Sequence, residues 1–415
     1  MFDHLLSEQQ LKFRDEIRDF VKSIPSQMIL DMDANKITFP KEFLQEAGRR
    51  NLLGCRYSKK WGGREMNWVT ASMAMEEIGT LGYIFACTFG VGAELVCDAL
   101  MIHGSDEQKE KYVFPLLQGK VFAAECLTEP RGGSDFFGTS TKAEDKGDYF
   151  LLNGQKRFIV GGEGADFFLV YARTDAQAES HKGISALIVE RGPGVETPYH
   201  YGLMGCRGGG TSRVVFRDVK VPKKNIVGRM NGGFEVFKTM MIPERLGTAA
   251  MTIGAARPAL EIATDYSSRR KAFGRPVAQF QGVSFQIAEA VTLLDTSRSM
   301  VYVTSEAVDK GVEEKKLRRM VSETKRFVTE SCQQVAHNAM QVIGGIGYTD
   351  VFPVERIHRD LRLASIWTGT NEIMNVIIAE EWYKERQKMR EARKTRDSES
   401  DAASADQVEE KNYGE

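Results

Sequence analysis

Apolar residues recur at helical spacing in the first part of the chain. Leu11, Ile17 and Phe20 would lie on one helix face, which predicts amphipathic helices. The segment Ser105-Asp106-Glu107-Gln108 is typical of a helix start, because a hydroxyl N-cap precedes an acidic first turn. We therefore expect a helical N-terminal domain over residues 1–120.

The pattern changes between residues 121 and 228. Short runs rich in β-branched and aromatic residues, such as 167–171 and 184–189, alternate with Asn-Gly, Gly-Gly and Pro-Gly turns. This alternation predicts a small β domain, either a barrel or a sandwich.

Helical periodicity returns after the turn Asn231-Gly232-Gly233. Pro243 suits the first turn of a helix, and Gly311 indicates a break between two long helices. We expect a C-terminal four-helix bundle over residues 229–385 and an α+β multidomain fold overall. Residues 386–415 are charged and nearly free of large apolar side chains, which predicts a disordered tail, with a partner-docking tail as the alternative.

Composition narrows the class of protein. The 415 residues are 42% hydrophobic and 27% charged, as in ordinary globular proteins, and a net charge of −1 makes nucleic acid an unfavourable partner. We expect no apolar run long enough to cross a bilayer and no signal peptide, hence a cytoplasmic protein, or a processed mitochondrial matrix protein in a eukaryote. Six scattered cysteines and six scattered histidines show no ligand spacing, so no metal is expected.

Two separated motifs carry the candidate chemistry. The segment 126–135 (CLTEPRGGSD) ends a strand-like run in a glycine-rich turn, whose backbone N–H groups can approach a flat ligand. About two hundred residues later, 341–348 (QVIGGIGY) is followed by 366–373 (IWTGTNEI). Together these motifs resemble the two signatures of the acyl-CoA dehydrogenase flavoenzymes, in their order and separation. The resemblance extends from Leu6 to about Glu381 and implies a helix–β–helix layout with bound FAD.

The resemblance also implies which residues contact FAD. The turn would place Thr128 near the flavin while Asp135 holds the turn itself, and Phe158 would cover the flavin. Val160 stands where many members carry a threonine near flavin N5. The segment 269–276 matches a pyrophosphate clamp supplied by a neighbouring subunit, which implies a homo-oligomer, most simply a homotetramer built as a dimer of dimers. The full set of implied cofactor contacts is Thr128, Gly133, Ser134, Phe158, Val160, Arg270, Phe273, Gln281, Gln341, Gly344, Gly345, Thr370 and Glu372.

The catalytic base departs from the common pattern of this family. Many members keep a glutamate directly before Gly-Thr, where this chain has Thr368, and a threonine cannot accept the substrate α-proton near neutral pH. Members for isovaleryl and long-chain substrates place the base on another helix, immediately before an arginine. Glu244, followed by Arg245, matches that arrangement and is the expected base. The resemblance implies substrate contacts at Ser134, Arg245, Trp367 and Thr368.

Two other interpretations of these carboxylates stay open. Glu244 could simply be an acidic first-turn residue that complements a helix dipole after Pro243. Glu94, in the apolar run 89–96, could serve as the base, or it could be a core carboxylate paired with an arginine.

The resemblance implies FAD-dependent α,β-dehydrogenation of an acyl-CoA thioester to an enoyl-CoA, a step in fatty acid or carboxylic acid degradation. The resemblance also implies that electrons pass to an electron-transferring flavoprotein. No Gly-x-Gly-x-x-Gly follows a strand and opens a helix, so a nicotinamide site is not expected. A base on the alternate helix leaves room for a branched, alicyclic or long acyl group. The alternatives are a flavin monooxygenase, a flavin-binding relative that lost dehydrogenation, and an acyl-CoA oxidase.

Overall fold

The computed structural model describes residues 2–179 and 181–392. Its N-terminal part is helical, and the helices are α1 (Glu8–Ser23), α2 (Ser26–Asp33), α3 (Lys41–Arg49), α4 (Trp68–Gly79), α5 (Tyr83–Gly90), α6 (Cys97–His103), α7 (Asp106–Gln108) and α8 (Phe114–Leu117). The side chain of Ser105 accepts a hydrogen bond from the backbone of Gln108, whose side chain bonds back to the Ser105 N–H. This capping box confirms the predicted start of α7.

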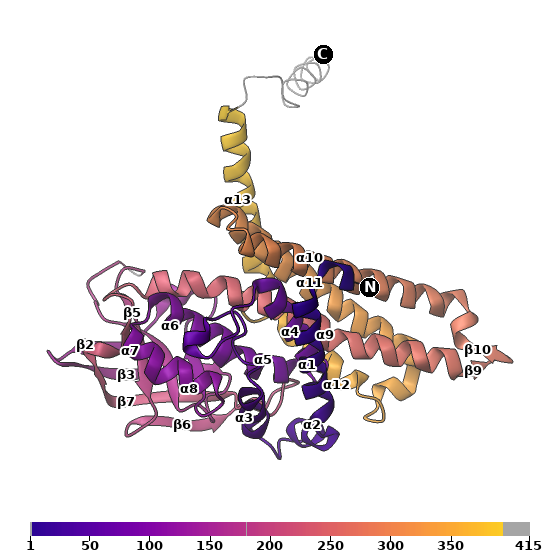
Figure 1. Ribbon diagram of the computed structural model, residues 1–415, viewed down its shortest axis with the longest axis horizontal. Coiled ribbons are helices and arrows are strands. Elements are labelled where there is room, and N and C mark those ends of the chain that lie inside the picture. Colours follow the sequence, from indigo (N-terminus) through magenta and orange to yellow (C-terminus); the bar gives the residue numbers. More distant parts are fainter. Residues whose placement is uncertain (1, 180, 393–415) are drawn as a thin grey trace, which may run out of the picture.

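Helices α5 and α6 are joined by a π-helical turn, Val91–Val96, into one continuous apolar segment. By length and composition this segment, Tyr83–His103, could cross a membrane, so the expectation that no run was long enough is wrong. However, 83% of its most apolar stretch is buried inside the protein. The segment is therefore a core helix, which contacts α4 and α8 of the N-terminal part and the long C-terminal helix that begins at Gly233 (Figure 1).

The middle of the chain forms an eight-stranded, mostly antiparallel sheet within the described residues, in the order β6-β7-β3-β2-β4-β5-β8, with β1 parallel to β4. Its strands are β1 (Ala123–Cys126), β2 (Lys142–Asp145), β3 (Tyr149–Ile159), β4 (Phe167–Arg173), β5 (Ile184–Glu190), β6 (Val195–His200), β7 (Ser212–Pro222) and β8 (Ile226–Val227). Alternate residues of β4 separate two cores: Phe168 and Val170 belong to the core of the β domain, whereas Leu169 and Tyr171 pack with the helices.

One expected turn proved to be part of a strand. Asn153-Gly154 does not end a hairpin, because β3 continues through it with a shift of register against β7. Gly154 has φ +151°, and a Cβ there would lie 2.5 Å from Thr141 Oγ1. Close packing against Thr141, rather than a turn, therefore explains this glycine.

The C-terminal part is a bundle of long helices, α9 (Gly233–Arg269), α10 (Gln281–Asp309), α11 (Glu314–Ile343), α12 (Val354–Leu361) and α13 (Asn371–Ala392). Helix α4 packs onto α9 and α10. Pro243 lies inside α9 and not in a first turn, so that expectation is wrong; packing on both sides of α9 sustains the helix through the proline. Helix α13 continues through residues 386–392, which the predicted tail included, and residues 393–415 lie outside the described chain.

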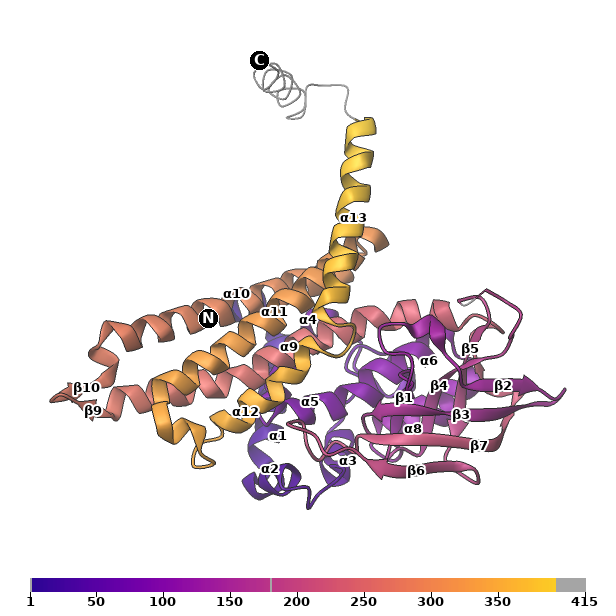
Figure 2. The same ribbon diagram turned by 180° about the vertical axis from the view of Figure 1, so that it is seen from behind.

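The ends of α9 lie far apart in the molecule. Its first residue, Gly233, packs against Ile184 of β5, and its last, Arg269, leads into a small hairpin of β9 (Lys271–Ala272) and β10 (Arg275–Pro276). Figures 1 and 2 show the β domain at one end of the molecule and this hairpin at the other, with α13 projecting between them.

Candidate active site

The glycine-rich turn after β1 is held rigid by a buried carboxylate. Glu129 accepts hydrogen bonds from the backbone N–H groups of Ser140 and Thr141 at 2.7 and 3.0 Å and pairs with Lys156 Nζ at 2.8 Å. Burial acts to raise the pKa of Glu129, but the charge and hydrogen bond of Lys156 outweigh it and lower that pKa to about 2. Asp135 accepts a hydrogen bond from the Gly138 N–H at 3.1 Å and so closes the far side of the turn.

This turn and the end of β3 form one exposed surface. The Arg157 N–H donates to the Thr128 carbonyl at 2.8 Å, which brings the turn beside Phe158. Phe158 has φ +56° and a side chain that is 50% exposed, and its ring lies 4.6 Å from that of Tyr201. A large aromatic ring in a strained backbone conformation at the surface is typical of a residue that a planar ligand covers.

Glu244 lies in the interior of α9 with one oxygen, Oε2, buried and without a hydrogen-bond partner among residues 2–179 and 181–392. Burial raises the pKa of Glu244 to about 7, while the charges of Arg245 and Lys325 oppose that rise. Arg245 is itself buried, and burial lowers its pKa to about 10 while Glu244 acts to raise it. A carboxylate with a pKa near neutrality and an unused oxygen has the properties of a general base.

The Trp367-Thr368-Gly369 loop lies against Arg245, the neighbour of Glu244 in α9. Lys325 Nζ donates to the Gly369 carbonyl at 2.9 Å, and a Cβ on Gly369 would lie 3.6 Å from Arg245 Nη2. Trp367 Nε1 donates to the Tyr83 hydroxyl at 3.0 Å, which fixes the loop to α5. Thr368 has φ +56°, and its Oγ1 is buried without a partner in the described chain. The structure thus brings Glu244, Arg245 and Thr368 into one neighbourhood.

The remaining predicted cofactor residues lie elsewhere. Arg270, Phe273 and Gln281 lie in or beside the β9–β10 hairpin, which is at the opposite end of the molecule from the β domain (Figure 2). Phe273 is 96% exposed, and Arg270 forms no ion pair within the described residues. Other predicted contacts lie at the end of α11 or in the turn that follows it (Gln341, Gly344, Gly345) and at the start of α13 (Thr370, Glu372).

Models of the N-terminal, middle and C-terminal domains of acyl-CoA dehydrogenases match residues 7–120, 124–219 and 231–383. The chain belongs to the acyl-CoA dehydrogenase family.

Relatives with established names cover nearly the whole chain. Subunit CarC of the caffeyl-CoA reductase–Etf complex of Acetobacterium woodii is 35% identical over 377 residues, 90% of this chain and 98% of that protein. Mitochondrial isovaleryl-CoA dehydrogenase of Oryza sativa is 34% identical over 384 residues, 92% and 93% of the two chains. The solved structure of butyryl-CoA dehydrogenase from Megasphaera elsdenii has a TM-score of 0.87 at 30% identity and covers 91% of this chain and 99% of that one.

FAD is the cofactor of the acyl-CoA dehydrogenases, and the residues present fit it. Gly133 has nothing within 4 Å of the position of a Cβ, so its backbone is open to a close ligand. The exposed Phe158 ring beside it offers a cover for a flat ring system, and the exposed Arg270 offers a bidentate contact for phosphate.

Glu94, the other candidate base, is already engaged. Its Oε2 accepts from Arg56 Nε at 3.0 Å, and the same guanidinium bonds Asp98 at 2.8 Å and covers the Trp68 ring at 3.6 Å. Burial raises the pKa of Glu94 and Arg56 opposes the rise. These contacts favour the interpretation of Glu94 as a paired core carboxylate.

Glu125 on β1 is a further carboxylate of this region, and the sequence motifs did not indicate it. Burial, followed by the charge of Glu244, raises the pKa of Glu125 well above its usual range. The available signal was a lone acidic residue in the apolar run 121–126, the same signal that drew attention to Glu94.

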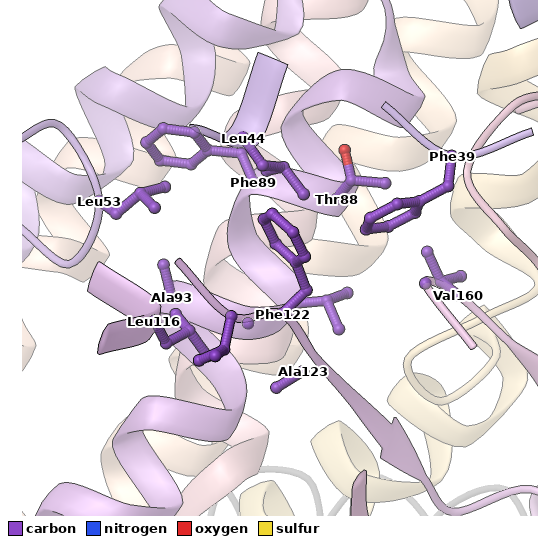
Figure 3. Close-up of a pocket in the computed structure, with 14 residues that line it drawn as sticks. Phe39, Leu44, Leu53, Thr88, Phe89, Ala93, Leu116, Phe122, Ala123 and Val160 are labelled. Carbon is purple, nitrogen blue, oxygen red and sulfur yellow. The ribbon is translucent and has the colours of Figure 1, made fainter. Parts of the chain in front are cut away.

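A small apolar cavity lies between the core helix and β1. It has a volume of about 20 Å³, room for about one water molecule, and Phe39, Phe89, Phe122 and Val160 are among its lining residues (Figure 3). Its lining does not include Glu94 or Glu244. Among the described residues there is also no group of three or more metal-ligating side chains.

Proposed function

We propose that this protein removes hydrogen from the α and β carbons of an acyl-CoA thioester, with Glu244 as the base. The observation that carries the proposal is the unpartnered, buried Oε2 of Glu244, whose neighbours in charge, Arg245 and Lys325, both contact the Thr368 loop at Gly369. A base must be ionised to accept a proton, and a pKa of about 7 keeps a useful fraction of Glu244 ionised at neutral pH.

The proposed reaction removes one proton and one hydride from the substrate, and each has an acceptor. Glu244 takes the α-proton of the thioester, and a C=C bond forms between the α and β carbons as the β C–H pair of electrons leaves as hydride. FAD, when bound, accepts that hydride. Arg245 and Lys325 keep the Glu244 pKa from rising further, and the Trp367–Tyr83 hydrogen bond holds the loop that borders the reacting carbons.

We infer that the complete FAD site is built from two copies of the chain. The turn at Thr128 and the ring of Phe158 would bind the flavin in one copy, and Arg270, Phe273 and Gln281 of a neighbouring copy would bind the pyrophosphate. The separation of the β9–β10 hairpin from the β domain within one chain supports this arrangement (Figure 1). A homotetramer made of two such dimers satisfies every site.

The proposed electron acceptor is an electron-transferring flavoprotein. The name of the Acetobacterium relative places that protein in a complex with Etf, which supports the proposal. The exposed Phe158 and the exposed end of the turn leave the flavin region accessible to such a partner.

For the substrate, we favour a branched, alicyclic or long acyl group. The base reaches the α-carbon from α9, and the position before Gly-Thr carries Thr368 in place of a longer glutamate. The similarity to an isovaleryl-CoA dehydrogenase supports this choice.

The test is anaerobic flavin reduction. Purified yellow protein is mixed with each member of a panel of straight, branched, alicyclic and aryl acyl-CoAs, and the loss of oxidised-flavin absorbance is followed. Glu244→Gln should keep FAD and acyl-CoA binding but lower the reduction rate at least ~10²-fold. Glu235→Gln, an exposed carboxylate on the same helix, is the matched control and should reduce normally.

Three results would change the proposal. An unaffected Glu244→Gln rate together with a disabled Glu94→Gln variant would move the base to Glu94. Yellow protein that no acyl-CoA reduces would favour a monooxygenase or a non-dehydrogenating relative. Rapid oxygen consumption by the reduced protein would favour an oxidase.

A further inference from the structure

Two polar side chains lie side by side on the face of the sheet that packs against the helices. Glu125 of β1 is paired with Leu169 of β4, two residues before Tyr171 in the same strand. Ala124 and Cys126, on either side of Glu125, point into the core of the β domain. Because side chains alternate along a strand, Glu125 points to the opposite face, where Tyr171 also lies.

Both side chains carry a buried atom whose hydrogen-bonding capacity is unused. Glu125 Oε1 and Tyr171 Oη have no hydrogen-bond partner within residues 2–179 and 181–392, and Tyr171 is fully buried. The Tyr171 hydroxyl is close enough to act on the pKa of Glu125, but the two groups do not reach hydrogen-bond geometry. Buried polar atoms without partners are costly, and at a binding site a ligand satisfies them.

These two groups lie within reach of the charge of Glu244. Burial, followed by the charge of Glu244, raises the pKa of Glu125, and burial, the charge of Glu125 and that of Glu244 raise the pKa of Tyr171, which favours the neutral forms of both groups. Phe136 and Phe237 flank Tyr171, with ring centroids 5.4 and 6.4 Å away, both edge to face. The cluster therefore combines a neutral carboxylic acid, a phenol and aromatic walls beside the carboxylate that takes the α-proton.

We propose that Glu125 and Tyr171 bind a neutral oxygen atom, a hydroxyl or a carbonyl, on the acyl group of the substrate beyond the β-carbon. This inference rests on the proposed function, because it places the acyl group beside Glu244. A protonated carboxylic acid and a phenol can each donate and accept a hydrogen bond, which suits either kind of oxygen. The two groups thus determine specificity for an oxygenated acyl chain.

Electrostatic repulsion and the hydrogen-bonding needs of Glu125 and Tyr171 both favour a substrate with a neutral oxygen. A substrate carboxylate would bring a second negative charge towards the ionised base, which is unfavourable. A plain hydrocarbon would leave both polar atoms unsatisfied, and sites built to hydrogen-bond a substrate oxygen reject analogues that lack it.

The experiment compares acyl-CoAs of equal size on the FAD-loaded enzyme. One pair is 4-hydroxybutyryl-CoA and pentanoyl-CoA, and the second is 5-oxohexanoyl-CoA and 5-methylhexanoyl-CoA. In each pair an oxygen replaces a methyl group. The measured quantity is kcat/KM for anaerobic flavin reduction, and we expect the oxygenated member to be preferred at least ~10-fold in one or both pairs.

Three variants assign the preference to these residues. Glu125→Met should abolish or reverse it while FAD content, read from the absorbance spectrum, stays the same. Tyr171→Phe should weaken it, and Glu125→Gln, which keeps a donor and an acceptor, should retain most of it. Retention by Glu125→Gln separates hydrogen bonding from a merely structural role and is informative even if Glu125→Met folds poorly.

The outcomes distinguish this inference from the proposed function. Reduction of the flavin by hydrocarbon acyl-CoAs at least as fast as by their oxygenated partners, in both pairs, would overturn the inference and leave dehydrogenation standing. An unchanged preference in both Glu125→Met and Tyr171→Phe would overturn it too. Failure of every acyl-CoA to reduce the flavin would reject the proposed function and this inference together.

Discussion

The ammonium group of Lys325 donates a 2.9 Å hydrogen bond to the carbonyl oxygen of Gly369. This bond ties α11 to the loop that carries Thr368. The same ammonium lowers the pKa of Glu244, and its own pKa is lowered to about 8 by burial and by the charge of Arg245. One lysine therefore couples the position of the loop to the ionisation of the base.

The reaction should require deprotonation of a group with a pKa near 7. Burial raises the pKa of Glu244 above its usual value to about 7, so the carboxylate forms only as pH rises through that value. Below pH 7 the rate of flavin reduction at low substrate should fall about tenfold per pH unit, and above it the rate should level off. Stopped-flow measurements from pH 5.5 to 8.5 test this, and a flat profile would contradict Glu244 as the base.

Removing the charge of Lys325 should shift that profile. The Lys325 charge lowers the pKa of Glu244, so Lys325→Met should raise it and move the rising limb to higher pH. Lys315→Met, an exposed lysine on the same helix, is the control and should leave the limb in place. A limb at the wild-type position in Lys325→Met would show that the two groups are not coupled.

Some elements follow from local sequence, and others depend on packing that the sequence pattern does not show. The capping box at Ser105 is local, so the start of α7 was predictable. Pro243 reads as a helix start, but tertiary packing carries α9 through it, and Asn153-Gly154 reads as a hairpin turn but lies inside β3. The π-helical turn at Val91–Val96 has no sequence signal of its own.

The candidate site also has parts that the sequence predicts and parts that only the fold shows. The motif Glu244-Arg245 identified the base position by resemblance, and only the structure showed its unpartnered oxygen beside Thr368. Glu125 and Tyr171 are 46 residues apart and meet only through the parallel pairing of β1 with β4. Sequence periodicity contains no information on that pairing, so their proximity could not be predicted.

The buried pair of Lys156 and Glu129 should stabilise the flavin-binding turn. Their side chains are 0% and 2% exposed, so Lys156→Met would leave an unpaired buried carboxylate and should cost about 3–5 kcal/mol of unfolding free energy. Urea denaturation measures this, with the exposed Lys120→Met as the control. Equal midpoints for the two variants would contradict the role of the pair.

The same pair predicts a pH dependence of stability. The pKa of Glu129 is lowered to about 2, so its contribution to stability is fully present above the usual glutamate value near 4.5. It should be lost as pH falls from there through 2. Glu129→Gln should therefore show a weaker loss of unfolding free energy with acid than the wild type does.

Loss of Arg270 should weaken FAD binding. A bidentate contact between a guanidinium and a phosphate is worth about 1.5–3 kcal/mol, so Arg270→Ala should raise the dissociation constant of FAD about 10- to 150-fold. Fluorescence titration of the apoprotein with FAD measures the change, and the exposed Lys316→Ala is the control. Unchanged affinity in Arg270→Ala would place the phosphate contact elsewhere.

A carboxylate at position 368 should partly replace the base on α9. Thr368 is β-branched at φ +56°, a conformation that a glutamate adopts with less strain, and the adjacent Gly369 lies beside Arg245. In the Glu244→Gln background, Thr368→Glu should therefore increase the flavin reduction rate at least ~10-fold. The rate should stay below that of the wild type, because a misplacement of the base by about 1 Å can cost ~10²-fold. Thr368→Gln in the same background is the isosteric control and should give no increase. Equal rates for the Thr368→Glu and Thr368→Gln variants would show that positions 244 and 368 do not reach the same α-proton. A rate that rises with pH only in the Thr368→Glu variant would place both carboxylates at one site.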